Sequence, residues 1–165
     1  MHLWIISGLV GLAWALARQR IPGRSAGKAL GGSHSLASPL ASLPCPPATQ
    51  SVKINTHNRD LAVKSAFIRY GPLNMSDQSY WRMVAQKWGT TPAVARESRC
   101  ANCAAFDLSP RMKGCMPGAI QKDGGGELGY CHMHLFKCSS LRSCLTWVGG
   151  GPITTDQVSA DWQKE

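Results

Sequence analysis

The clearest pattern of apolar and polar positions begins just after Met75. Apolar side chains recur there at the spacing of one buried helix face. They are Tyr80, Trp81, Val84, Ala85 and Trp88. Ser76 or Asp77 is placed to cap the start of this helix, and Gly89 is placed to end it. A second, short helix is expected over residues 92–98, because Thr-Pro is a common helix start. The tryptophans are expected to pack in a core, since a small domain needs large aromatic side chains to exclude water.

The first 74 residues have no comparable pattern. Residues 3–17 form an apolar run, shorter than the ~20 residues of a membrane-spanning helix but of the length of a signal-peptide core. Basic residues follow this run instead of preceding it, so the run is either an export or anchor signal or a fortuitous apolar stretch. Residues 22–50 are rich in Pro, Gly, Ser and Ala, which predicts a linker. Residues 53–70 predict a short strand or helix.

The net charge of the chain also changes abruptly near residue 75. The chain has a net charge of +9 and a pI near 9.5, which would favour a polyanionic partner. However, residues 1–74 hold eight of the 18 basic residues and one of the 9 acids. That segment therefore carries +7, and residues 75–165 carry only +2. We expect no specific nucleic-acid partner, and a membrane association only if residues 3–17 are a real signal or anchor.

These changes predict three segments. Residues 1–74 are an N-terminal extension, residues 75–152 a cysteine-rich domain, and residues 153–165 a polar tail in which Trp162 docks back. We hypothesise that Met75 is the native start. The extension would then be dispensable.

The cysteines are concentrated in the predicted domain. Their pattern is Cys100-x2-Cys103-x11-Cys115-x15-Cys131, followed by Cys138 and Cys144, with Cys45 apart. A Cys-x2-Cys pair presents two thiolates to one centre from a single turn, and two later cysteines complete a ligand set. This spacing fits a four-cysteine zinc site or an iron–sulfur cluster. It fits a disulfide framework less well.

The residues around these cysteines carry a resemblance to a known family. Gly114 precedes Cys115, Pro117-Gly118 follows it, and Gly129-Tyr130 precedes Cys131. Over about residues 100–134 the chain resembles the high-potential iron–sulfur proteins, which are small electron carriers. The Tyr80-Trp81, Trp88-Gly89-Thr90 and Gly149–Ile153 segments are also similar to small uncharacterised phage proteins that carry this type of domain.

The resemblance implies a small, irregular, metal-stabilised fold, in which short helices and a minor hairpin near residues 115–131 surround one [4Fe-4S] cluster. It implies the ligands Cys100, Cys103, Cys115 and Cys131. The cluster shell is expected to include Phe106, Met116 and Tyr130. The implied function is one-electron transfer with an unnamed redox partner protein, and no catalytic residues are expected. His134 departs from the family pattern, which has an aromatic residue there.

Cys138 and Cys144 have no assigned counterpart in that family. Leu135, Cys138, Leu141 and Leu145 lie near helical spacing within residues 129–147, which predicts buried thiols on a helix. A disulfide between the two cysteines, or replacement of Cys131 as a ligand by one of them, would also fit the sequence.

The rival functions are a structural zinc-binding module and a disulfide-stapled interaction or virion protein, both without redox activity. We expect a periplasmic location if residues 3–17 act as a signal, and the host cytoplasm or a virion otherwise.

Overall fold

The computed structural model describes residues 43–71, 74–116 and 126–164. All of them belong to one unit, residues 36–165. The expectations for residues 3–17 and for most of the linker lie outside the described residues. The helices are α1 (Pro47–Gln50), α2 (Val52–Lys64), α3 (Gln78–Trp88), α4 (Pro92–Glu97), the 3-10 turn η2 (Cys100–Asn102), α5 (Pro110–Cys115) and α6 (Asp156–Lys164).

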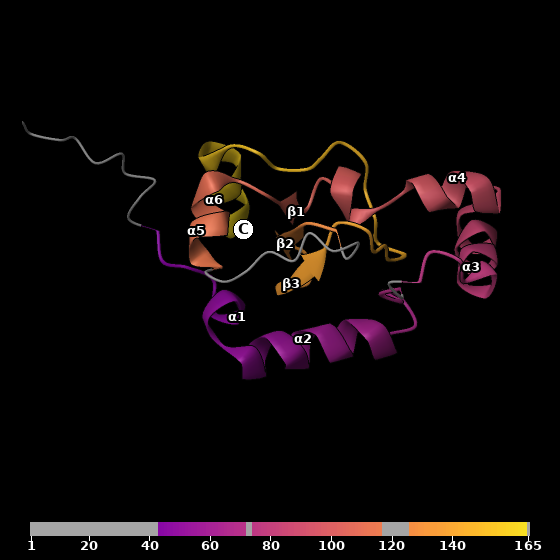
Figure 1. The fold of residues 1–165 in the computed structure, drawn as a ribbon, viewed down its shortest axis with the longest axis horizontal. Coiled ribbons are helices and arrows are strands. Elements are labelled where there is room, and N and C mark those ends of the chain that lie inside the picture. Colours follow the sequence, from indigo (N-terminus) through magenta and orange to yellow (C-terminus); the bar gives the residue numbers. More distant parts are fainter. Residues whose placement is uncertain (1–42, 72–73, 117–125, 165) are drawn as a thin grey trace, which may run out of the picture. The chain divides into compact units, whose positions relative to one another are not determined.

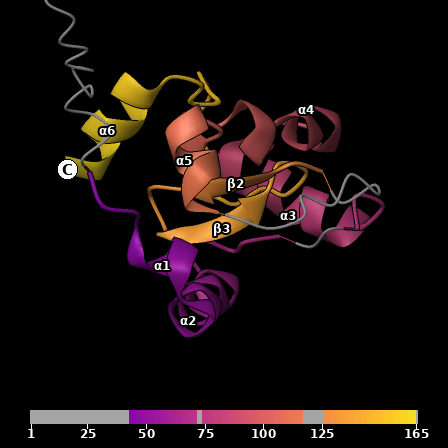
Figure 2. The same cartoon turned by 60° about the vertical axis from the view of Figure 1, so that its left-hand side comes forward.

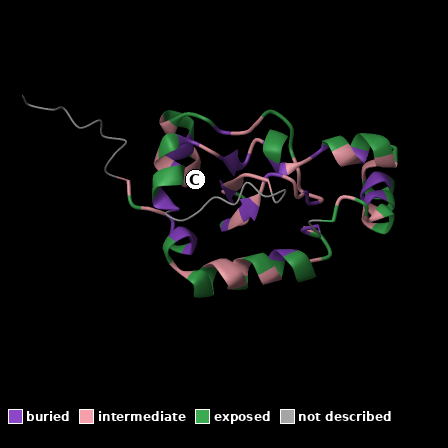
Figure 3. Ribbon diagram, viewed as in Figure 1, coloured by how far each residue is buried: buried purple, intermediate pink, exposed green. Residues whose placement is uncertain are grey.

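Three short antiparallel strands form the sheet at the centre of this unit (Figure 1). They are β1 (Phe106–Asp107), β2 (Leu128–Cys131) and β3 (Phe136–Ser139), in the order β1-β2-β3. Helix α2 packs against β3, and α5 packs against β2, so the sheet lies between them in Figure 2. The strands are largely buried, whereas α2 exposes much of its surface (Figure 3).

The helix predicted after Met75 is confirmed as α3. The Asp77 side chain accepts hydrogen bonds from the first free backbone N–H groups, and Gly89 ends the helix in the left-handed conformation with φ of 64°. Trp81 is 2 % exposed, as expected for a core residue. The second predicted helix is confirmed as α4, where the Thr91 side chain caps the first turn.

The helix expected over residues 129–147 is wrong. The chain there forms the β2–β3 hairpin, with Tyr130 opposite Lys137 and Cys131 opposite Phe136. Phe136 and Cys138 are buried while the residues after them are half-buried, which is the two-residue period of a strand. The hairpin expected near residues 115–131 is therefore displaced along the chain, because β2 pairs with the strand that follows it. Residues 117–125 lie outside the described ranges.

Residues 43–71 pack against the cysteine-rich part of the chain. Helix α2 (Val52–Lys64) covers most of residues 53–70 and is one of the two elements expected there. The Asn58 side chain donates to the carbonyl of Leu135 at 2.7 Å, and the ring of Tyr70 packs on Phe136 with centroids 4.8 Å apart. Residues 43–71 and the cysteine-rich part thus belong to the same unit, and the predicted domain bounds stay a prediction. A translation start at Met75 stays a prediction.

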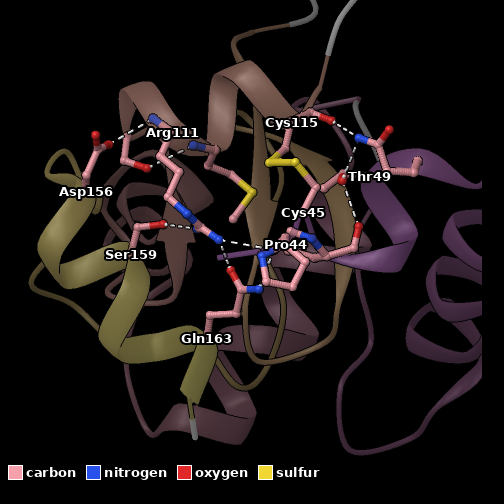
Figure 4. Close-up of a disulfide and its surroundings, with 12 residues drawn as sticks. Pro44, Cys45, Thr49, Arg111, Cys115, Asp156, Ser159 and Gln163 are labelled. Carbon is pink, nitrogen blue, oxygen red and sulfur yellow. Dashed lines mark hydrogen bonds between the residues drawn. A yellow bond between two sulfur atoms is a disulfide. The ribbon is translucent and has the colours of Figure 1, made fainter. Parts of the chain in front are cut away.

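The segment expected to be a polar tail contains a helix. Ile153 is 5 % exposed and pairs with Asp107, and α6 follows it. Helix α6 packs on α5, where the backbone N–H of Arg111 donates to Asp156 (Figure 4). Trp162 packs against the core as expected, with its ring 5.9 Å from that of His132. No helix in the described part of the chain has the length and apolarity to span a membrane.

Candidate functional site

Five free cysteines line one cavity between the sheet and the segments that flank it. They are Cys100, Cys103, Cys131, Cys138 and Cys144. Cys100 begins the η2 turn and Cys103 directly follows it, the next two come from β2 and β3, and the last comes from the loop after β3. Four of the five are buried, and Cys131 is half-buried. Segments more than 40 residues apart thus bring their sulfur atoms to one place.

The rest of the cavity wall is mainly apolar. Ala105, Phe106, Met133, His134, Thr146 and Trp147 complete it. Its free volume is about 10 Å³, roughly the room for one water. The sulfur atoms therefore lie almost against one another and against the apolar side chains.

The central thiol is Cys138, which hydrogen-bonds to the side chains of both Cys100 and Cys131. These bonds and burial hold the pKa of Cys138 well above its usual value. The bond from Cys138 lowers the pKa of Cys131, despite its burial. Burial raises the pKa of Cys103, and it raises that of Cys144 to about 12. Neutral thiols are thus favoured at most of these positions when no cation is nearby.

Backbone N–H groups point at three of the sulfur atoms. Cys103 accepts from Ala105 and Val148. Cys131 accepts from Met133 and His134, and Cys144 accepts from Thr146. Such N–H···S bonds stabilise a negative sulfur, because each donor offers its positive end to the thiolate. They are also one of the means by which proteins tune iron–sulfur clusters.

The Cys-x2-Cys turn is fixed from two sides. On one side, the N–H of Cys100 donates to the carbonyl of Arg142 at 2.7 Å. On the other, Ala104 donates to Val148 at 2.8 Å, and Gly151 donates to Asn102 at 3.2 Å. A Cβ atom at Gly151 would overlap the carbonyl of Cys103. The glycine-rich segment after Val148 therefore covers the turn closely, and only glycine permits this approach.

A buried contact between Asp107 and His132 lies at the end of β2, directly after Cys131. His132 Nε2 lies 2.7 Å from Asp107 Oδ2, and the ring of Tyr130 packs edge-on against that of His132. Burial alone would raise the pKa of Asp107, but hydrogen bonds from His132, Ser159 and Ser109 outweigh it and lower the pKa. His132 directly follows Cys131, so this contact holds the end of the strand that carries the Cys131 thiol.

Cys115 lies away from the cavity. It forms a disulfide with Cys45, with the Cα atoms 5.5 Å apart (Figure 4). The Gln50 side chain donates to the carbonyl of Cys115 at 2.6 Å, and Arg111 donates to the carbonyl of Pro44 at 3.2 Å. The structure therefore joins Cys115 to the segment before α1 and not to the other predicted ligands.

Of the predicted ligands, Cys100, Cys103 and Cys131 come together, and Cys115 does not. Cys138 and Cys144 join them as free thiols, so the structure shows no disulfide between these two cysteines. Of the expected shell, Phe106 lines the cavity, whereas Tyr130 and Met116 pack in a separate cluster with Cys115. The cavity-lining residues that sequence reasoning missed are Ala105, Met133, Thr146 and Trp147. The short separation of Cys131 and Cys138 in the sequence could have indicated that a hairpin brings them together. The surrounding leucines and cysteines also fit a helical period, and this led to the prediction of a helix.

As the side chains stand, no group of three or more His, Cys, Asp or Glu among the described residues is arranged to hold a metal ion. The donor set nevertheless has the chemistry of a soft-metal site, since thiolates select zinc, copper(I) and iron–sulfur clusters. Comparisons with family models, with curated proteins and with solved structures gave no match to this chain.

Proposed function

We propose that the five-cysteine cavity holds a [4Fe-4S] cluster and that the protein is a small one-electron carrier. The observation that carries this proposal is the convergence of five free cysteines from four segments on one mainly apolar cavity. Clusters of this type need four thiolate ligands, so the cavity offers one more than is needed. When bound, the cluster would supply the one-electron chemistry.

A zinc ion and a cluster differ in the size of the body that the cysteines must surround. Zinc requires four donors about 2.3 Å from one point, and no such group occurs in the described residues. A cube of irons and sulfides instead takes ligands distributed around a larger body. The small free volume means that the cysteine side chains must rotate outward to receive it.

The surroundings of the cavity would suit redox chemistry. The Phe106 and Trp147 rings would exclude water, and the N–H groups directed at Cys103, Cys131 and Cys144 would stabilise charge on sulfur. Solvent access and hydrogen bonds to sulfur are two of the quantities that set a cluster's potential.

The disulfide favours a second candidate function. Cys45 and Cys115 close a loop with a sequence separation of 70, as in proteins stapled for an oxidising environment. In that case the five buried thiols would only fill the core, and the chain would be a structural interaction or virion component. A zinc module is the third candidate.

The test is metal analysis of the full chain. The protein is produced anaerobically, reconstituted with iron and sulfide, and examined by visible spectroscopy with iron, sulfide and zinc determination. We expect a brown protein with about four irons and four sulfides per chain. A colourless protein with one zinc, or a metal-free protein whose five thiols stay reduced, would overturn the proposal.

Single substitutions identify the ligands. Each of the five cavity cysteines is replaced by serine, and iron per folded chain is measured. Because a cube takes four ligands from five thiols, we expect four variants to lose most of the iron and one to keep it. The matched control is Cys45→Ser, which removes a cysteine outside the cavity and should leave the iron content unchanged. Retention of iron by all five variants would show that the cavity is not the site.

A further inference from the structure

Two of the five cavity cysteines, Cys131 and Cys138, are brought into contact by the pairing of β2 with β3. Cys131 lies opposite Phe136, two residues before Cys138, and side chains two positions apart share one face of a strand. The register therefore places both thiols on the same face of the hairpin, where their side chains hydrogen-bond. The contact is thus a consequence of the backbone pairing and needs no further group to hold it.

The two thiols differ in their access to solvent. Cys131 is half-buried, whereas Cys138 is 2 % exposed. The cavity reaches the surface at the turn between β2 and β3, since Met133 both lines the cavity and is 39 % exposed. A small oxidant that enters beside this turn therefore meets Cys131 before it meets Cys138.

The Cys131 sulfur is the better placed of the two to attack an oxidant. It accepts hydrogen bonds from the backbone N–H groups of Met133 and His134, and such donors stabilise the negative sulfur that acts as the nucleophile. Cys138 offers a second thiol in contact with it. An accessible thiol beside a resolving thiol is the arrangement typical of peroxide-sensitive cysteines.

The remaining three cavity thiols are less accessible. Cys100 shares the contact with Cys138, but both it and Cys103 are buried, each 8 % exposed. The sulfur of Cys144, which is also buried, lies 3.2 Å from the hydroxyl oxygen of Thr146. Cys131 is the one half-buried member of the five. The pair that combines contact with access is therefore Cys131–Cys138.

We propose that a hydroperoxide oxidises this dithiol to a Cys131–Cys138 disulfide. The Cys131 sulfur attacks one peroxide oxygen, so that an S–O bond forms and the O–O bond breaks. With hydrogen peroxide, the other oxygen leaves as water with the thiol proton, and Cys131 becomes a sulfenic acid. The Cys138 sulfur then attacks the Cys131 sulfur, the S–S bond forms, and the hydroxyl leaves as a second water with the Cys138 proton. The two thiols together have then lost two electrons to the peroxide.

The disulfide would control loading of the cavity, and this part of the inference rests on the proposed function. The five free cysteines exceed by one the four that a cube needs. Joining two of them leaves three, so the oxidised chain lacks a complete ligand set. We therefore expect the reduced chain to take up the cluster and the oxidised chain not to take it up until the disulfide is reduced.

Peptide mapping tests the disulfide itself, without iron. The iron-free full chain is treated with a small excess of hydrogen peroxide in native buffer, blocked with an alkylating reagent and digested with trypsin without reduction. Trypsin cuts after Lys137, so the expected disulfide joins residues 123–137 to residues 138–142. A different cavity pair as the main product, or five cavity thiols that all stay free, would overturn the proposal whether or not the chain binds iron.

Serine variants separate the roles of the two thiols. Cys138→Ser removes the resolving thiol, so Cys131 sulfenic acid should accumulate and be trapped by dimedone several-fold more than in the parent. Cys131→Ser should give neither the linked peptides nor a Cys138 adduct. The matched control is Cys144→Ser, a buried cavity cysteine outside the pair, which should give the linked peptides at the parent level. A dimedone adduct on Cys138 in Cys131→Ser would overturn the assigned order of attack, and loss of the disulfide in folded Cys144→Ser would overturn the pair as the site.

Iron uptake tests the consequence for loading. Reduced and peroxide-treated chains are each supplied with ferrous iron and sulfide without a thiol reductant, bound iron is measured after desalting, and the disulfide is verified again by mass spectrometry. We expect about four irons in the reduced chain and at least a ten-fold loss in the chain that retains the disulfide. Equal uptake by both would overturn the control of loading. Absence of iron from the reduced chain would instead overturn the proposed function and leave the disulfide result standing.

Discussion

His132 Nε2 lies 2.7 Å from Asp107 Oδ2, and the two side chains are 3 % and 0 % exposed. The pair joins β1 to the end of β2, on the side of the sheet that faces Trp162. His132 directly follows Cys131, so the pair holds the end of the strand that carries this cavity cysteine.

Replacing Asp107 with asparagine should destabilise the protein strongly. The Asp107 carboxylate accepts hydrogen bonds from His132, Ser159 and Ser109, and loss of a hydrogen bond to a charged group typically costs about 1.5–3 kcal/mol. We expect the free energy of unfolding, measured by urea denaturation, to fall by about that amount. The control is Asp161→Asn on the exposed face of α6, where a change within about 0.5 kcal/mol is expected. Similar losses in both variants would show that the Asp107–His132 pair has no special role.

The same pair predicts a pH dependence. The folded-state pKa of Asp107 lies below the ordinary value of 3.8, so the unfolded chain binds the proton more tightly. The contribution of Asp107 to stability is thus fully present above the unfolded pKa and is lost as the pH falls through the lower folded pKa. Unfolding curves should show the parent losing more stability than Asp107→Asn as the pH falls below about 4. Parallel pH profiles would contradict this prediction.

Gly151→Ala should damage the cover over the Cys-x2-Cys turn. The added Cβ would overlap the backbone carbonyl of Cys103, and this backbone cannot move without breaking the contacts of Ala104 and Asn102. We expect a loss of about 1–3 kcal/mol in unfolding free energy, together with lower iron content if the cavity binds a cluster. Gly114→Ala is the matched control, because nothing lies within 4 Å of a Cβ there. It should be neutral or slightly stabilising in α5.

Removing the disulfide should weaken the fold without affecting the cavity. Cys45→Ser and Cys115→Ser delete the same cross-link, whose sequence separation is 70. Each should therefore lower the unfolding free energy by about 2–4 kcal/mol. Both should leave iron binding intact. Loss of iron in Cys115→Ser alone would instead support the ligand assignment implied by the family resemblance.

Thiol reactivity should follow the hydrogen bonds in the cavity. Alkylation attacks the thiolate, and the pKa of Cys131 is lowered whereas that of Cys144 is raised to about 12. In the iron-free native chain at pH 8, peptide mass spectrometry should find Cys131 labelled by iodoacetamide well before Cys144. In concentrated urea the two should react alike. Labelling of Cys144 first under native conditions would show that Cys131 is not the more acidic of the two thiols.

Local sequence signals predicted the elements that depend on near neighbours. Asp77, Gly89 and Thr91 correctly marked the ends of α3 and α4, because capping involves groups within a few residues of each other. The tight Cys100–Cys103 turn was also recognisable, since its two thiols come from one turn of the chain. The hairpin was missed because the leucines and cysteines of residues 129–147 match a helical period as well as they match a strand.

The sequence by itself determined that α3 and α4 form, that Trp81 is in a core, and that Cys100 and Cys103 face a common point. Only the tertiary structure decided which distant cysteines join them. The β2–β3 pairing brings Cys131 and Cys138 together, and the loop after β3 adds Cys144, whereas the packing of α1 near α5 places Cys115 beside Cys45. The residues next to a cysteine in the sequence do not specify which distant cysteine it will meet. The long-range packing of apolar elements therefore determines where each sulfur lies.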